Sequence, residues 1–175
     1  MVSIDIIRVA LSDIDELQKI SRQTFTETFS AQNTEENLKK YLDESLSSKQ
    51  LTAELNDPSA QFYFAMLDRK VIGYLKLNSG ASQTELKDDK ALEIERIYVS
   101  KEFHGKQVGQ MLYDKAIQVA TQAHAQYVWL GVWEENKRAI SFYRKNGFVA
   151  FDKHIFTLGD DEQVDIMMKL ELKGL

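Results

Sequence analysis

The stretch EIERIYVSKEFHGKQVGQMLYDKAI, residues 93–117, is the most informative part of the chain for the fold. It begins with the alternation of a β-strand, continues in a short loop with two glycines, and ends with the apolar spacing of an amphipathic helix. The first amides of a helix lack backbone partners and lie at its positive end, so amides from Gly105 to Gln110 can surround a diphosphate. Taken alone, the same pattern is equally typical of a structural turn.

The loop differs from two other phosphate-binding loops. It lacks both the G-x-x-x-x-G-K-[ST] pattern of nucleotide hydrolases and the G-x-G-x-x-G pattern of dinucleotide-binding folds. Lys106 either adds positive charge to an anion site here or is an ordinary solvated lysine.

A second informative segment is WEENKRAISFYRKNGF, residues 133–148. Asn136, Ala139 and Tyr143 recur at three and four residues, which places them on one face of a helix. Ala139 is small enough to leave room for a ligand. The alternative is that Phe142 and Tyr143 are ordinary core aromatics.

The order of elements along the chain predicts a mixed α/β (α+β) fold in one domain, residues 1–175. Strands are expected at 3–10, 61–67, 71–78, 92–99, 127–133, 148–156 and 164–170. Helices are expected after an N-cap at Ser12, after an N-cap at Asn33, in a stretch ending at Leu55, over 109–123, and from Glu135 to Asn146.

Composition excludes several classes of protein. With 43% hydrophobic and 28% charged residues and no long apolar run, the chain is expected to be soluble, cytoplasmic and without membrane association. A net charge of -5 argues against a nucleic-acid partner. The absence of cysteine excludes disulfides and thiol nucleophiles, and His104, His124 and His154 have no metal-site spacing, so no metal is expected.

These two segments together resemble the GNAT superfamily of acetyl-CoA-dependent N-acetyltransferases. HGKQVG is similar to the family's Q/R-x-x-G-x-G/A pyrophosphate loop, with His104 in place of Gln or Arg and Gln107 in place of Gly. The resemblance covers essentially the whole chain and implies a mostly antiparallel sheet of about seven strands flanked by helices. It implies acetyl-CoA contacts at Ile97, Tyr98, Val99, His104, Gly105, Lys106, Gln107, Val108, Gly109, Gln110, Asn136, Ala139, Phe142, Tyr143 and Lys145.

The resemblance also assigns chemical roles. Tyr143 is implied as the general acid that protonates the leaving thiolate, and a strand amide near Ile97 and Val99 polarises the thioester carbonyl. Alternation in residues 92–99 places Glu93, Glu95, Ile97 and Val99 on one face, so either glutamate is a candidate base for the amine, unless both are solvated edge charges. Lys145 either reaches the coenzyme or stays on the surface.

Four segments, 25–42, 92–99, 129–136 and 159–168, look more narrowly like bacterial PaiA-type polyamine acetyltransferases. A small-molecule amine such as spermidine or spermine is then the expected partner, met by Glu27, Glu35 and Glu36, which are otherwise solvated helix charges. The alternatives are acetylation of a protein N-terminus or lysine, and a non-catalytic acyl-CoA-binding regulator. The sequence leaves both a monomer and a homodimer open.

Overall fold

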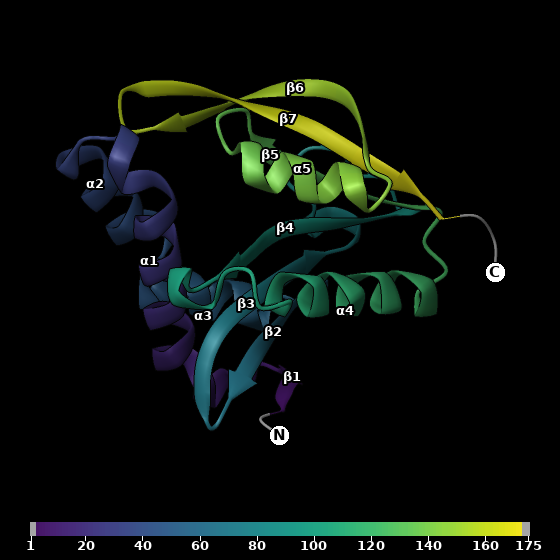
Figure 1. Ribbon diagram of the computed structural model, residues 1–175, viewed down its shortest axis with the longest axis horizontal. Helices are drawn as coiled ribbons and strands as arrows, with labels where there is room; N and C mark the ends of the chain where they lie inside the picture. Colours follow the sequence, from purple (N-terminus) through teal and green to yellow (C-terminus); the bar gives the residue numbers. More distant parts are fainter. Residues whose placement is uncertain (1–2, 173–175) are drawn as a thin grey trace.

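The computed structural model describes residues 3–172 (Figure 1). Its strands are β1 (Ile4–Arg8), β2 (Ala60–Leu67), β3 (Lys70–Asn78), β4 (Ala91–Val99), β5 (Tyr127–Trp133), β6 (Val149–Leu158) and β7 (Asp161–Glu171). Its α-helices are α1 (Ile14–Phe29), α2 (Glu35–Ser45), α3 (Ser48–Asn56), α4 (Val108–Gln122) and α5 (Lys137–Lys145). None of the helices in this part of the chain is long and apolar enough to cross a membrane.

The seven strands form one sheet in the order β1-β2-β3-β4-β5-β7-β6. All neighbouring strands are antiparallel except β4 and β5, which run parallel. In Figure 1 the sheet rises from β1 at the bottom to β6 and β7 at the top. The predicted fold, a mixed and mostly antiparallel sheet of about seven strands flanked by helices, is confirmed.

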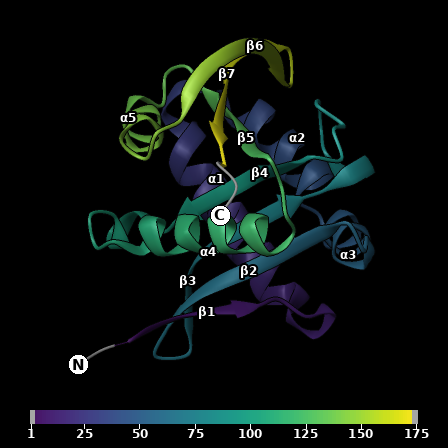
Figure 2. The same cartoon turned by 90° about the vertical axis from the view of Figure 1, so that its right-hand side faces the viewer.

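Two apolar clusters hold the helices against the sheet. On one face α4 contributes Val108, Leu112, Ala116 and Val119, which recur at helical spacing, and α5 adds Ile140 and Tyr143. On the other face α1 contributes Leu17, Ile20, Phe25 and Phe29, and α3 contributes Leu51. Figure 2 shows α4 extended across the strands and α5 beside the β5–β7 end of the sheet.

The parallel pair β4–β5 is short, and this gives the fold its functional opening. The two strands pair only at Ala91↔Tyr127, Leu92↔Val128 and Glu93↔Trp129. Beyond this point β4 stays with β3 and β5 stays with β7, so the two strands separate. A splay therefore opens in the middle of the sheet.

An irregularity in β4 changes which side chains share a face. The adjacent residues Lys76 and Leu77 of β3 pair with Arg96 and Ile94, so Glu95 is an extra residue in a β-bulge. Ile97 and Val99 pack with the α4 cluster, whereas Glu95 contacts Lys76 on the opposite side. The predicted alternation, which placed Ile97 and Val99 on the face of Glu93 and Glu95, is wrong because the bulge interrupts the period of two.

The starts of the first two helices differ slightly from expectation. The N-cap predicted at Ser12 is wrong: α1 begins at Ile14 after Asp13, whose carboxylate accepts the Ala10 N–H at 2.8 Å. The cap predicted at Asn33 is off by one residue, because the Thr34 side chain accepts the Asn37 N–H at 3.1 Å.

Candidate active site

The splay opens into a cavity of about 810 Å³. Its walls come from α1, β4, the loop before α4, the start of α4, β5, α5 and the β6–β7 pair. The cavity therefore joins the two halves of the sheet. Among residues 3–172 no group of three or more histidine, aspartate or glutamate side chains is arranged to hold a metal ion.

The loop before α4 presents unpaired amides to this cavity. The first helical hydrogen bond runs from the Met111 N–H to the Gln107 carbonyl at 3.1 Å, so the amides of Val108, Gly109 and Gln110 have no helical carbonyl to reach. All three residues line the cavity, as does Gly105, which has a φ of 77° and open space around the position of a Cβ. The loop can thus bring backbone N–H groups close to an anion.

Gln107 has the backbone conformation of a glycine. Its φ of 68° and ψ of 6° are left-handed, and its side chain makes no capping hydrogen bond. The loop therefore holds a residue with a Cβ in a conformation that glycine adopts without penalty, at a cost in backbone strain. Lys106 is absent from the cavity lining, and its Nζ lies 5.3 Å from the centre of the Phe103 ring.

His104 ties this loop to β4 and α5. Its Nε2 lies 2.8 Å from the Val99 carbonyl oxygen, and its Nδ1 contacts the Arg138 guanidinium. A guanidinium only donates, so Nδ1 accepts and Nε2 donates its proton to the carbonyl. His104 thereby holds the positively charged Arg138 guanidinium at the cavity wall, beside the amides of the loop.

The free edge of β4 also faces the splay. The Ser100 N–H donates to the Ile72 carbonyl of the neighbouring chain segment at 2.8 Å. Because hydrogen-bonding groups alternate in direction along a strand, the amides of Ile97 and Val99 point away from β3. Ile97, Tyr98 and Val99 all line the cavity, so this edge can pair with an extended ligand as an added strand would.

Helix α5 supplies the opposite wall. Asn136 caps it, with its Oδ1 accepting the Ala139 N–H at 3.2 Å, and Ala139, Phe142 and Lys145 line the cavity. Tyr143 also lines the cavity and is only 6% exposed. Burial raises the pKa of Tyr143 above its usual value. The phenol therefore stays protonated and can donate to a developing anion.

The two predicted bases both have partners within the protein. Glu93 is 2% exposed, and it accepts hydrogen bonds from the Asn78 amide at 3.0 Å and from the Thr84 N–H and hydroxyl at 2.8 and 2.6 Å. Burial raises its pKa even though these three donors oppose the shift. Glu93 thus fixes the loop that carries Thr84 against β3 and β4.

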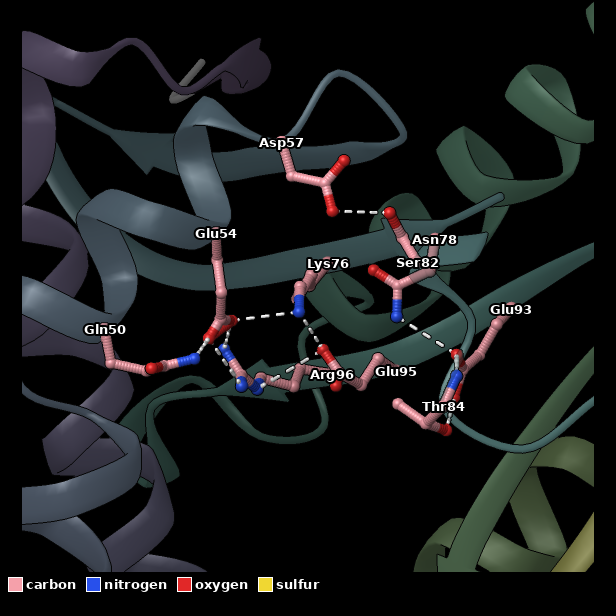
Figure 3. A network of polar contacts seen from close by, with 10 residues as sticks. All are labelled: Gln50, Glu54, Asp57, Lys76, Asn78, Ser82, Thr84, Glu93, Glu95 and Arg96. Atoms are coloured by element: carbon pink, nitrogen blue, oxygen red, sulfur yellow. Dashed lines mark hydrogen bonds and ion pairs between the residues drawn. The ribbon is translucent and has the colours of Figure 1, made fainter. Parts of the chain in front are cut away.

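Glu95 belongs to a buried ion network. Figure 3 shows Lys76 between Glu54 and Glu95, with its Nζ 2.9 Å from a Glu54 oxygen and also paired with Glu95. Arg96 joins the same two carboxylates at 2.8 and 3.7 Å. Burial alone would raise the pKa of Glu54, but Arg96 and Lys76 lower it. The Glu95 charge is therefore already compensated.

The predicted acceptor residues are not all at the cavity. Glu27 lines it, and its carboxylate accepts the Lys101 N–H at 3.2 Å. Glu35 and Glu36 are exposed in the first turn of α2, outside the cavity lining, so their contact with the acceptor stays a prediction. Their negative charge suits the positive end of α2.

Sequence reasoning missed a group of cavity residues on β5, β6 and β7. Trp133, His154, Phe156 and Asp165 all line the cavity. Asp165 is paired in register with Trp133 on one side and with His154 on the other. The alternation of Gln163, Asp165 and Met167 along β7 was the available signal, but the partner strands could not be read from it.

The fold and this cavity are those of an acyltransferase, and comparison with known proteins gives the family. A sequence model described as "Acetyltransferase (GNAT) family" matches residues 14–148. The chain therefore belongs to the GNAT family and is an N-acetyltransferase, as its motifs predicted. Enzymes of this family use acetyl-CoA as the acetyl donor.

Three similar proteins illustrate the relationship. An uncharacterized N-acetyltransferase in the pepI 3′ region of Lactobacillus delbrueckii subsp. lactis is 38% identical over 98% of this chain and 99% of its own. The spermidine N(1)-acetyltransferase of Thermoplasma acidophilum is 26% identical over 86% of this chain and 91% of its own. The crystal structure of a PaiA N-acetyltransferase from Thermoplasma acidophilum, in complex with coenzyme A, has a TM-score of 0.80 and 25% identity over 97% of this chain and 99% of its own.

Proposed function

We propose that this enzyme transfers the acetyl group of acetyl-CoA to a primary amine of a polyamine such as spermidine or spermine. The transfer is direct, within a ternary complex. The observation that carries the proposal is the single cavity in which unpaired amides at one end meet carboxylates and aromatic rings at the other. The similarity to a spermidine N(1)-acetyltransferase supports the choice of acceptor.

The coenzyme end of the cavity fits a diphosphate with an extended arm. The amides of Val108, Gly109 and Gln110 can bind the diphosphate oxygens, and Arg138 and Lys145 of α5 add positive charge from the opposite wall of the cavity. The free amides of Ile97 and Val99 can bind the arm along β4.

The residues of the splay can perform the transfer. Both reactants lie in one cavity, which lowers the entropic barrier to their reaction. A free β4 amide can stabilise the oxyanion that forms as the amine attacks the thioester carbonyl. Tyr143 donates its proton to the sulfur as the carbon–sulfur bond breaks. No cysteine is present to form an acyl-enzyme.

The acceptor end favours a cation with an apolar chain. Its carboxylates are Glu27, Glu85, Glu93, Glu95 and Asp165, and its aromatic rings include Phe29, Tyr41, Trp133 and Phe156. Alkylammonium groups are attracted both to carboxylates and to the faces of aromatic rings. A polyamine carries both ammonium groups and methylene chains along its length.

The test is an acceptor panel. Thiol release from acetyl-CoA is measured with spermidine, spermine, shorter diamines, aminoglycosides and peptides, and the acetylated product is identified by mass spectrometry. We expect the highest kcat/KM with a polyamine. A peptide-only profile would defeat the polyamine assignment in favour of a protein acetyltransferase, and binding of acetyl-CoA without turnover of any amine would indicate a regulator.

One structural observation argues against the regulator. The departure of Gln107 from the glycine of the family pattern would weaken coenzyme binding if the loop changed shape. Gln107 nevertheless adopts a left-handed conformation that glycine also adopts readily, so this loop shape is open to either residue. Tyr143 is also retained in the cavity.

A further inference from the structure

The acceptor side of the cavity contains one half-buried carboxylate that the protein leaves without a partner. Asp165 of β7 lines the cavity and makes no hydrogen bond or ion pair with any residue in 3–172. The other carboxylates of this region are occupied: Glu93 by Asn78 and Thr84, Glu95 by Lys76 and Arg96, Glu85 by His154, and Glu27 by the Lys101 N–H.

The position of Asp165 places it beside the splay. Directly opposite residues of neighbouring strands share a face, so Trp133, Asp165 and His154 lie side by side. A Cβ built on Gly131 would lie 3.5 Å from the Asp165 Oδ2, so the carboxylate reaches over Gly131 on β5, the strand that borders the opening. Gly131 is exposed although it lies in the centre of the sheet, which gives this carboxylate access to solvent.

The surroundings of Asp165 suit an alkylammonium ion. Trp133 packs against Phe29 with ring centres 5.2 Å apart, and Phe156 lies 6.2 Å from Phe29 and 6.0 Å from Tyr41. Such rings bind the methylene groups of a cation and attract its charge. The Asp165 carboxylate lies among these rings without a counter-ion, and the ammonium group of a bound acceptor supplies one.

We propose that Asp165 is the catalytic base that takes the proton from the ammonium group of the acceptor. This proposal rests on the proposed acetyl transfer to a primary amine. It moves the role expected of Glu93 or Glu95 to a residue on a different strand.

The proton balance is complete with groups already named. Asp165 takes one proton from the ammonium ion and releases it to solvent past Gly131, and the free amine then forms its bond to the thioester carbon. When the carbon–sulfur bond breaks, the thiolate takes a proton from Tyr143. The second proton, lost from the acetylated nitrogen, returns to Tyr143 through water. The net products are the amide, the thiol and one proton.

Charged and titratable neighbours set the pH at which Asp165 works. Burial raises the pKa of Asp165 to about 6, and His154 on β6 opposes the shift. His154 is itself paired with Glu85 at 3.1 Å. Burial raises the pKa of both Tyr98 of β4 and Tyr41 of α2, and the charge of Asp165 adds a smaller contribution in the same direction. A base of this strength is ionised at neutral pH and still able to accept a proton.

The experiment measures kcat and KM between pH 5.5 and 8.5, with saturating acetyl-CoA, for wild type, Asp165→Asn and Glu162→Gln. The acceptor is spermidine, or whichever amine of the panel is turned over fastest. Glu162 is the matched control because it is exposed on the same strand and outside the cavity. We expect Asp165→Asn to lower kcat by about 10²-fold or more and to abolish the acidic limb of the kcat/KM profile. Asp165→Glu should recover part of the rate.

Thermal unfolding shows whether the variant is folded and whether Asp165 is unpaired. A carboxyl whose pKa is raised in the folded state destabilises the folded protein, and this effect grows as pH rises from the pKa of the unfolded state to that of the folded state. We therefore expect Asp165→Asn to melt at a temperature no lower than wild type at pH 8, with its advantage shrinking toward pH 5. A lower melting temperature at both pH values would show that the carboxylate is paired and would overturn the proposal.

The kinetic outcomes separate the two proposals. If Asp165→Asn keeps kcat within about threefold of wild type, keeps the acidic limb, or loses activity only through KM, Asp165 is not the base while the acetyltransferase assignment stands. If wild type turns over no amine, both proposals fall together.

Discussion

Replacing Gln107 by glycine should stabilise the protein without weakening its coenzyme site. Gln107 precedes α4 with a φ of 68°, a region that L-residues other than Asn and Asp rarely adopt. Its side chain is exposed and makes no capping hydrogen bond, so its removal costs few contacts. The substitution also restores the residue that the family pattern has here.

The size of the effect follows from two opposing terms. A left-handed conformation costs a residue with a Cβ about 1–2 kcal/mol. Glycine loses about 0.5–1 kcal/mol more backbone entropy on folding, which offsets part of the gain. The net stabilisation should be about 0.5–1 kcal/mol, which for a chain of this length raises Tm by about 1–4 °C.

The assay is thermal unfolding by circular dichroism, with CoA affinity measured by calorimetry. Gln118→Gly is the matched control, because Gln118 is an exposed glutamine in the interior of α4, where glycine costs about 1 kcal/mol. We expect opposite signs for the two variants and a Kd for CoA within about threefold of wild type for Gln107→Gly. A fall in Tm for Gln107→Gly would refute the argument from backbone strain.

Three further outcomes are expected. Tyr143→Phe should lower kcat by about 10²-fold or more in the thiol-release assay, because the substitution removes only the proton donor. Calorimetry should show unchanged CoA binding. Tyr127→Phe is the control, because Tyr127 lies outside the cavity lining. Leu112→Ala should lower the urea-measured unfolding free energy by about 2–5 kcal/mol, since Leu112 is fully buried under the sheet. Lys76→Met should lower the unfolding free energy by about 3–5 kcal/mol, because Glu54 and Glu95 lose a buried counter-ion. A loss below about 1 kcal/mol in Leu112→Ala or in Lys76→Met would contradict the argument from burial.

The sequence predicted the elements well because each has a strong local signal. The helical spacing after Gly109, the alternation of the strands and the cap at Asn136 all depend on residues close together in the chain. Cap positions were less secure: both Asn33 and Thr34 can cap α2, and only the folded backbone favours Thr34. The β6–β7 turn is also shorter than the gap between the predicted strands 148–156 and 164–170, because β6 ends at Leu158 and β7 begins at Asp161.

The parts of the site that the sequence could not predict depend on contacts between distant residues. The bulge at Glu95 arises from the register of β3 against β4, which alternation within one strand does not reveal. Whether Glu93 or Glu95 is free depends on Thr84 and Lys76, which come from other segments. Asp165 reaches the cavity only because β7 lies next to β5, across a crossover in the strand order.

The three-residue seam between β4 and β5 has a mechanical consequence. Strand pairing transmits little force across so short a join, and the halves β1–β4 and β5–β7 depend on the shared apolar core for their alignment. A ligand that binds both walls of the opening holds the two halves of the sheet together. Amides on either side of the seam should then exchange with deuterium more slowly once the coenzyme is bound, and those of β1 and β2 should change least.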